Sequence, residues 1–179
     1  MSDMRVALLR GINVGRAKRI AMADLRALVE RLGYHDVRTL LNSGNVVFSV
    51  PASVKGDPAS RIEKAVATEL GVVSRVIVLT AKEVAAVVDG NPLGKVADNP
   101  SRLLVTVLAD PKTGTLLKPL LQQSWTPEAV AVKGRIVYLW CPDGIIDSPL
   151  GQAVSRIVSD GGTARNIATM GKLLDLVRV

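Results

Sequence analysis

The feature that most constrains the fold is the order in which strand-like and helix-like patterns follow one another in the first eighty residues. Apolar residues at helical spacing predict two helices there, with C-terminal stops at Gly33 and Gly71. Four short apolar runs are typical of strands, at residues 5–9, 37–41, 46–50 and 73–79. The resulting order is βαββαβ, the split βαβ arrangement of a ferredoxin-like domain.

Capping residues support the helix boundaries. Asp57 followed by Pro58 is an N-cap followed by proline at the first helical position. Thr80 and Glu83 have the spacing of a capping box, which predicts a short helix that ends near Gly90.

A similar order recurs in the second half of the chain, although no repeat is visible in the sequence itself. Pro119 must shorten or distort the first helix of this half. The predicted strands lie at residues 103–108, 129–133 and 135–140, and the predicted helices at residues 115–122 and 150–158. A last helix has an apolar stripe formed by Met170, Leu173, Leu174 and Val177.

These patterns predict an α+β chain of two ferredoxin-like subdomains with antiparallel sheets, plus a C-terminal helix. The first subdomain is expected at residues 1–80 and the second, with the C-terminal helix, at residues 102–179. A helix and a polar linker with prolines fill residues 81–101.

Residue counts exclude several kinds of site. One cysteine, Cys141, cannot form an internal disulfide, and one histidine, His35, rules out a multi-histidine metal site. We therefore predict no metal and no cofactor. No apolar run is long enough to span a membrane and no signal peptide is visible, so we expect a cytoplasmic protein.

The net charge of +7 favours anionic partners. Residues 1–80 contain 12 basic and 7 acidic side chains, an excess of +5, so the first half is the better candidate for an anion surface. Aromatic residues make up 3% of the chain, which argues against stacking of RNA bases on a sheet. Binding to a nucleic-acid backbone remains open.

The leading candidate site consists of two glycine-containing turns that each abut a strand. Residues 10–19 carry four basic and no acidic side chains, but they lack the P-loop and dinucleotide-binding signatures. Glycine N–H groups would approach the anion, arginines and lysines would supply charge, and Asn13 and Asn45 would orient the ligand. The predicted ligand-binding residues here are Arg10, Gly11, Asn13, Gly15, Arg16, Lys18, Arg19, Ser43, Gly44 and Asn45.

A second candidate anion site lies at the start of the last helix. Arg165 precedes this helix, Asn166 or Thr163 is a plausible cap, and Lys172 lies within it. A helix N-terminus with adjacent positive charge favours anions. Whether this region and the first candidate share one site is left open.

Three motifs give the chain a family resemblance: residues 10–15 (RGINVG), residues 43–48 (SGNVVF), and residues 163–166 (TARN) followed by Lys172 and Leu173. In this order they resemble the bacterial family known as domain of unknown function 1697. The resemblance implies an α+β chain of paired ferredoxin-like units and no established activity.

The function predicted first is binding of a phosphate-bearing small molecule or a nucleic-acid backbone in a cleft lined by the loop at residues 10–19. One alternative is an enzyme that acts on a small anionic substrate, for which no catalytic residue is assigned. Another is an oligomerising scaffold without a ligand. The sequence predicts no oligomeric state.

Overall fold

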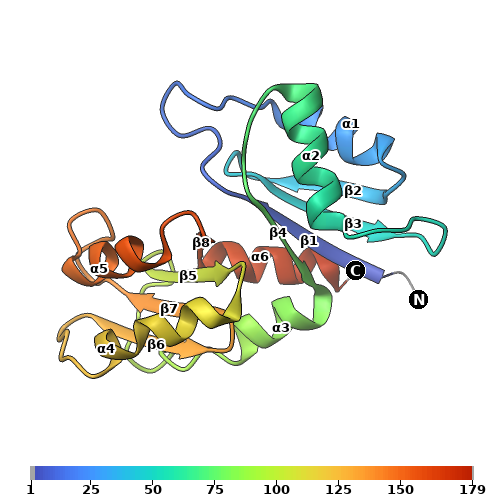
Figure 1. The fold of residues 1–179 in the computed structure, drawn as a ribbon. Coiled ribbons are helices and arrows are strands. Elements are labelled where there is room, and N and C mark those ends of the chain that lie inside the picture. Colours follow the sequence, from blue (N-terminus) through green and yellow to red (C-terminus); the bar gives the residue numbers. More distant parts are fainter. Residues whose placement is uncertain (1–2, 179) are drawn as a thin grey trace. The chain divides into compact units, whose positions relative to one another are not determined.

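The computed structural model describes residues 3–178 and divides into two compact units (Figure 1). The first unit comprises the residues up to Val84 together with those from Leu173 onward, and the second comprises Ala85–Lys172. Two helices therefore contain a unit boundary, α3 (Ala81–Asp89) and α6 (Ile167–Val177). Within residues 3–178, no helix combines the length and apolar character needed to cross a membrane.

The first unit has the predicted βαββαβ order. Its sheet is antiparallel with the strand order β2-β3-β1-β4, which is ferredoxin-like. The elements are β1 (Asp3–Leu9), α1 (Met22–Arg31), β2 (His35–Leu40), β3 (Asn45–Val50), α2 (Pro58–Leu70) and β4 (Val76–Thr80).

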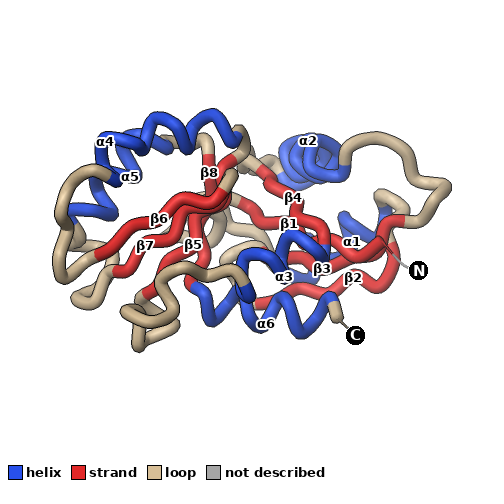
Figure 2. The backbone as a smooth tube through the Cα atoms, turned by 90° about the horizontal axis from the view of Figure 1, so that it is seen from below, coloured by secondary structure: helices blue, strands red, loops and turns tan. Residues whose placement is uncertain are grey.

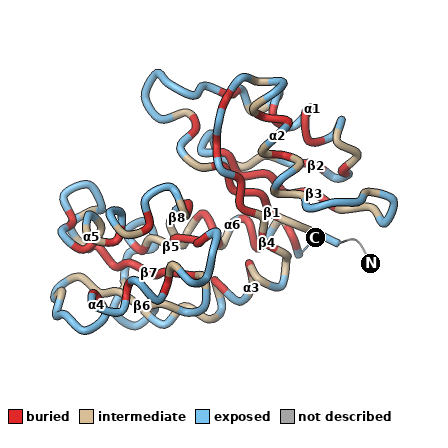
Figure 3. Tube along the Cα trace, viewed as in Figure 1, coloured by how far each residue is buried: buried red, intermediate tan, exposed pale blue. Residues whose placement is uncertain are grey.

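One core of this unit is formed by apolar residues of the sheet and of the helices α1 and α2. Figure 2 labels these elements. Alternate strand residues such as Ala7, Leu9 and Phe48 point toward this core, because successive side chains of a strand face opposite sides. Phe48 packs on Tyr34 with ring centroids 4.7 Å apart and planes inclined by 51°. Consecutive residues are buried from Val6 to Leu9 in β1 and from Asn45 to Ser49 in β3, so both faces of these strand segments are covered. Buried residues are red in Figure 3.

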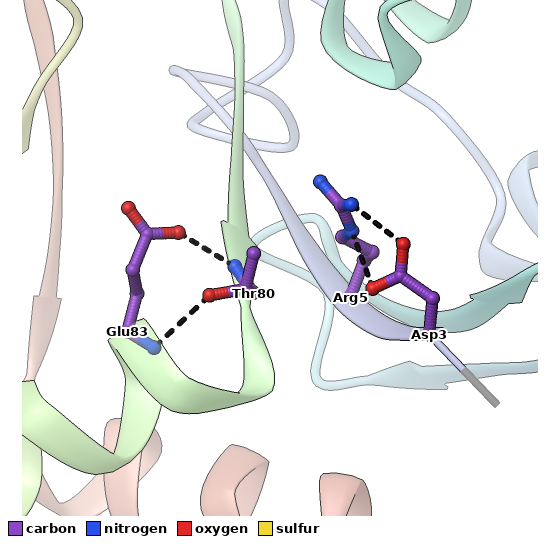
Figure 4. Close-up of polar contacts among 4 residues, drawn as sticks. All are labelled: Asp3, Arg5, Thr80 and Glu83. Carbon is purple, nitrogen blue, oxygen red and sulfur yellow. Dashed lines mark hydrogen bonds and ion pairs between the residues drawn. The ribbon is translucent and has the colours of Figure 1, made fainter. Parts of the chain in front are cut away.

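Both predicted helix caps of this unit are present. The Asp57 side chain accepts a hydrogen bond from the backbone N–H of Ser60 at 3.0 Å, at the start of α2. Thr80 and Glu83 form a reciprocal capping box at the start of α3, with bonds of 2.7 and 3.1 Å (Figure 4). On the neighbouring strand, Arg5 forms an ion pair with Asp3 (Figure 4).

The second unit repeats the topology. Its antiparallel sheet has the order β6-β7-β5-β8, which corresponds strand for strand to the first sheet. The elements are β5 (Leu103–Leu108), a 3₁₀ helix η1 (Pro111–Leu117), α4 (Lys118–Leu121), β6 (Ala129–Lys133), β7 (Ile136–Trp140), α5 (Pro149–Val158) and β8 (Gly162–Asn166).

The fold class predicted from the sequence is confirmed, with two differences in this unit. The single helix expected at residues 115–122 is a 3₁₀ segment followed by one α-turn that contains Pro119. Strand β8 was not predicted, because its polar sequence GTARN is equally typical of the approach to a helix. Pairing with β5 forms this strand despite its composition.

Candidate functional site

The loop between β1 and α1 has an unusual backbone. Gly11, Asn13, Gly15 and Lys18 all have positive φ, at 65°, 55°, 61° and 51°. Glycine adopts this left-handed conformation freely and asparagine tolerates it. A side chain added at Gly11 or Gly15 would meet no atom within 4 Å, so these two glycines serve the backbone conformation and not close packing.

Asn13 fixes the shape of this loop. Its backbone N–H donates to the Lys18 carbonyl at 3.0 Å, which closes residues 13–18 into a compact turn. Its side-chain oxygen accepts from the Ile20 N–H at 2.8 Å, and its side-chain nitrogen donates to the Ile20 carbonyl at 2.9 Å. The same nitrogen donates to the Asn42 carbonyl at 2.8 Å. The Asn13 amide therefore holds the loop together, whereas the sequence suggested that it would orient a ligand.

The two predicted turns lie side by side in the first unit. Besides the Asn13 to Asn42 bond, the Leu9 N–H donates to the Gly44 carbonyl at 2.9 Å. Ile12 is buried against Gly44, where an added Cβ atom would lie 2.8 Å from the Ile12 Cδ1 atom. Gly44 also has φ of 88°, so both its conformation and its packing exclude a side chain.

Asn45 is the first residue of β3 and is completely buried. Its side-chain nitrogen donates to the Leu40 carbonyl at 2.7 Å and to the Ser43 hydroxyl at 3.0 Å. The sequence placed Asn45 in the turn as a group that orients the ligand. In the structure it closes the turn from inside the protein.

The charged side chains of the loop are the part that faces solvent. Arg16, Lys18 and Arg19 are exposed, and the loop is pale blue along most of its length in Figure 3. Within residues 3–178, these three side chains form neither an ion pair nor a side-chain hydrogen bond. Three positive charges therefore lie on a short loop with no acidic side chain among residues 10–19.

Two residues that the sequence did not suggest lie beside the start of this loop. The backbone N–H of Arg10 donates to the Arg75 carbonyl at 2.9 Å, and the Ser74 hydroxyl donates to the Arg10 carbonyl at 2.7 Å. Arg75 is exposed and adds a further cation next to Arg10. The predicted ferredoxin-like order could have indicated that these two residues lie near Arg10, because it places the end of β1 against the start of β4.

The candidate residues near the last helix belong to the second unit. Arg165 lies on β8 and is buried, and its guanidinium donates to the Thr163 hydroxyl at 3.0 Å and to the Ala164 carbonyl at 2.8 Å. Burial lowers the pKa of Arg165 to about 10. The Asn166 side chain accepts from the Thr169 N–H at 2.8 Å, which confirms Asn166 as the cap of α6. Lys172 lies within α6 and is exposed.

Cys141 and the metal-ligating residue types remain to be described. Cys141 is buried with its sulfur 3.4 Å from the Ser148 hydroxyl, and burial raises the pKa of its thiol. Across residues 3–178, no three histidine, cysteine or acidic side chains are grouped so that they would hold a metal ion.

These observations define a class of protein, an α+β chain of two ferredoxin-like units with an internally hydrogen-bonded basic loop on the first. The chain matches the family described as "Protein of unknown function (DUF1697)" over residues 2–138 and belongs to that family. Among solved structures it is similar to the conserved bacterial protein SP0830 from Streptococcus pneumoniae, with a TM-score of 0.80 and 18% identity over 99% of both chains. This likeness shows a shared fold. No curated protein matches the chain.

Proposed function

We propose that the loop at residues 10–19 binds a phosphate-bearing anion. The observation that carries the proposal is the combination of a fixed backbone and exposed cations without acidic partners at Arg16, Lys18 and Arg19. Left-handed residues in such a loop turn successive N–H groups to one side, which is how backbone nests bind anions. A fixed loop also loses little conformational entropy when a ligand binds.

Charge reversal in the loop tests the proposal. In the double variant Arg16→Glu with Arg19→Glu, the formal net charge falls from +7 by four units to +3. We expect the affinity for inorganic pyrophosphate, measured by calorimetry, to fall at least about tenfold, because hydrogen bonds to charged groups contribute about 1.5–3 kcal/mol each.

The matched control changes the same number of charges elsewhere in the first unit. Arg38 on β2 and Lys82 on α3 are also exposed, and the double variant Arg38→Glu with Lys82→Glu also has a net charge of +3. This control is expected to retain pyrophosphate binding. Equal losses in both variants, or no binding by the unaltered protein at about 50 mM salt, would refute the proposed site.

A nucleic-acid backbone is the second candidate ligand, and it is favoured by the excess of +5 charges in the first 80 residues. Binding to phosphates along a strand requires that the logarithm of the affinity falls linearly with the logarithm of the salt concentration. We expect the slope to become shallower by about 1–2 in the loop double variant, since two phosphate contacts would be lost. A slope that is the same in both double variants would exclude the loop as a nucleic-acid contact.

A further inference from the structure

A groove of about 500 Å³ in the first unit lies between α2 and the segment that leads into β4. This volume falls within the range of small-molecule sites. Polar and charged side chains contribute much of the lining, and none of the lining residues is aromatic. The groups used below are Asp57, Ser60, Glu63, Lys64 and Ala67 at and within α2, and Ser74 and Arg75 before β4.

The groove borders the basic loop directly. Ser74 and Arg75 line the groove, and these two residues make the hydrogen bonds of 2.7 and 2.9 Å to the backbone of Arg10. The first residue of the loop is therefore held against one wall of the groove. An anionic group bound at the Arg10 end of the loop, beside Arg75, would lie next to this groove.

The groove offers hydrogen-bond acceptors as well as cations. One oxygen of Glu63 accepts from the Val76 N–H at 2.8 Å, and the Asp57 carboxylate accepts from Ser60 and from the Ala59 backbone N–H. A carboxylate has about four lone-pair sites, so both groups retain capacity to accept further hydrogen bonds. Lys64 and Arg75 line the groove, and neither forms an ion pair within residues 3–178. The groove thus combines cations for a phosphate with carboxylate oxygens that accept from hydroxyl groups.

We propose that this groove binds the sugar of a phosphorylated sugar whose phosphate lies at Arg75 and the loop at residues 10–19. The proposal rests on the proposed function, because the loop supplies the phosphate site. Sugar hydroxyls donate to Asp57 and Glu63, as ribose hydroxyls do to acidic residues in nucleotide-binding folds. The groove has no aromatic wall on which a nucleobase would stack, so the ligand class is a sugar phosphate and not a nucleotide.

Filling the groove tests this inference without removing a charge. Ala67 lies on the groove face of α2, and Ala67→Leu adds bulk there while keeping a good helix former. Ribose 5-phosphate is expected to bind the full-length protein at least about tenfold more tightly than inorganic phosphate, and free ribose to bind weakly. In Ala67→Leu this advantage of ribose 5-phosphate should disappear, while the affinity for inorganic phosphate stays unchanged.

Ala23→Leu on α1 is the matched control, because Ala23 is exposed and does not line the groove. It should retain the preference for ribose 5-phosphate. The inference is overturned if ribose 5-phosphate and phosphate bind equally, if Ala67→Leu keeps the preference, or if adenosine 5′-monophosphate binds more tightly than ribose 5-phosphate. Failure of the proposed function differs from these results, because then neither phosphate nor pyrophosphate binds at all.

Discussion

The two ferredoxin-like units share one topology but differ in the connection that follows their first strand. In the first unit β1 ends at Leu9 and α1 begins at Met22, so the connection is the twelve residues 10–21. In the second unit β5 ends at Leu108 and η1 begins at Pro111, which leaves only residues 109–110. The candidate anion site therefore belongs to a loop added at one position and not to the ferredoxin-like fold itself.

The hairpin turns of the two units also differ, because only the turn of the first unit packs against other residues at its glycine. Gly44, before β3, packs against Ile12 of the long connection and Leu9 at the end of β1. Gly134, before β7, has no atom within 4 Å of an added Cβ. Both glycines have positive φ, at 88° and 58°. The turn of the first unit supports the loop, and the turn of the second unit reverses the chain without packing against a neighbour at this position.

The largest effect is expected from Gly44→Ala. The left-handed backbone costs about 1–2 kcal/mol for a residue with a side chain, and the contacts of 2.8 and 2.9 Å add about 1–3 kcal/mol of overpacking. Gly134→Ala incurs only the backbone term, about 1–2 kcal/mol. Urea denaturation of the two variants measures both free energies of unfolding. Equal decreases in the free energy of unfolding would show that the packing of Gly44 against the loop does not contribute to stability.

A smaller effect is expected from removing the Asn13 side chain. Asn13→Ala loses three hydrogen bonds of 2.8–2.9 Å, which together should cost about 2 kcal/mol because the site is partly exposed. Asp110 in the short connection of the second unit makes one such bond, to the Lys112 N–H at 2.9 Å, and Asp110→Ala should cost about 1 kcal/mol.

Amide exchange at Ile20 and pyrophosphate affinity are the readouts for Asn13. Exchange at Ile20 should accelerate in Asn13→Ala, because the Asn13 oxygen that accepts from this N–H is gone. Pyrophosphate should bind more weakly to the same variant, because the loop is no longer fixed before the ligand arrives. Asn13→Gly is the control for backbone strain, since glycine adopts φ of 55° freely. If Asn13→Gly retains slow exchange at Ile20, the side-chain bonds do not hold the loop.

The fold was largely predictable from the sequence, whereas the site was predictable only in part. Periodicity and capping residues such as Asp57 and Thr80 act locally, so they located the helices and most strands. Strand β8 was not predicted because its polar residues form a strand only by pairing with β5, more than fifty residues earlier. Cross-strand packing, and not local propensity, determines such a strand.

The sequence indicated which residues of the candidate site are unusual better than it indicated what their side chains contact. The sequence identified Asn13 and Asn45, but their side chains bind backbone groups within the protein. Ser74 and Arg75 were missed, since they reach Arg10 through strand pairing more than sixty residues away. A motif shows which residues are unusual, but the partners of their polar atoms depend on tertiary structure.

The smallest predicted effect concerns the second helix of each unit, which begins at a different kind of cap. Asp57 caps α2, and the hydrogen bonds from Ser60 lower the pKa of this carboxyl below its usual value. Ser148 caps α5 with a hydroxyl that accepts from the Gly151 N–H at 2.8 Å and does not titrate in this range. Only the helix of the first unit should therefore lose cap stability in acid.

The sign follows from the direction of the pKa shift. Because the folded-state pKa of Asp57 lies below its unfolded value, the cap contributes fully above the unfolded pKa and is lost as the pH falls through the folded one. In Asp57→Ser the hydroxyl retains a cap that is independent of pH. The unfolding free energy of the unaltered protein should thus fall slightly relative to that of Asp57→Ser as the pH is lowered from neutral through the range in which carboxyl groups titrate, measured by urea denaturation; solvent screening keeps the effect small because Asp57 is exposed. A constant difference between the two proteins over this range would mean that the Asp57 charge does not stabilise α2, and that the two units are capped in energetically equivalent ways.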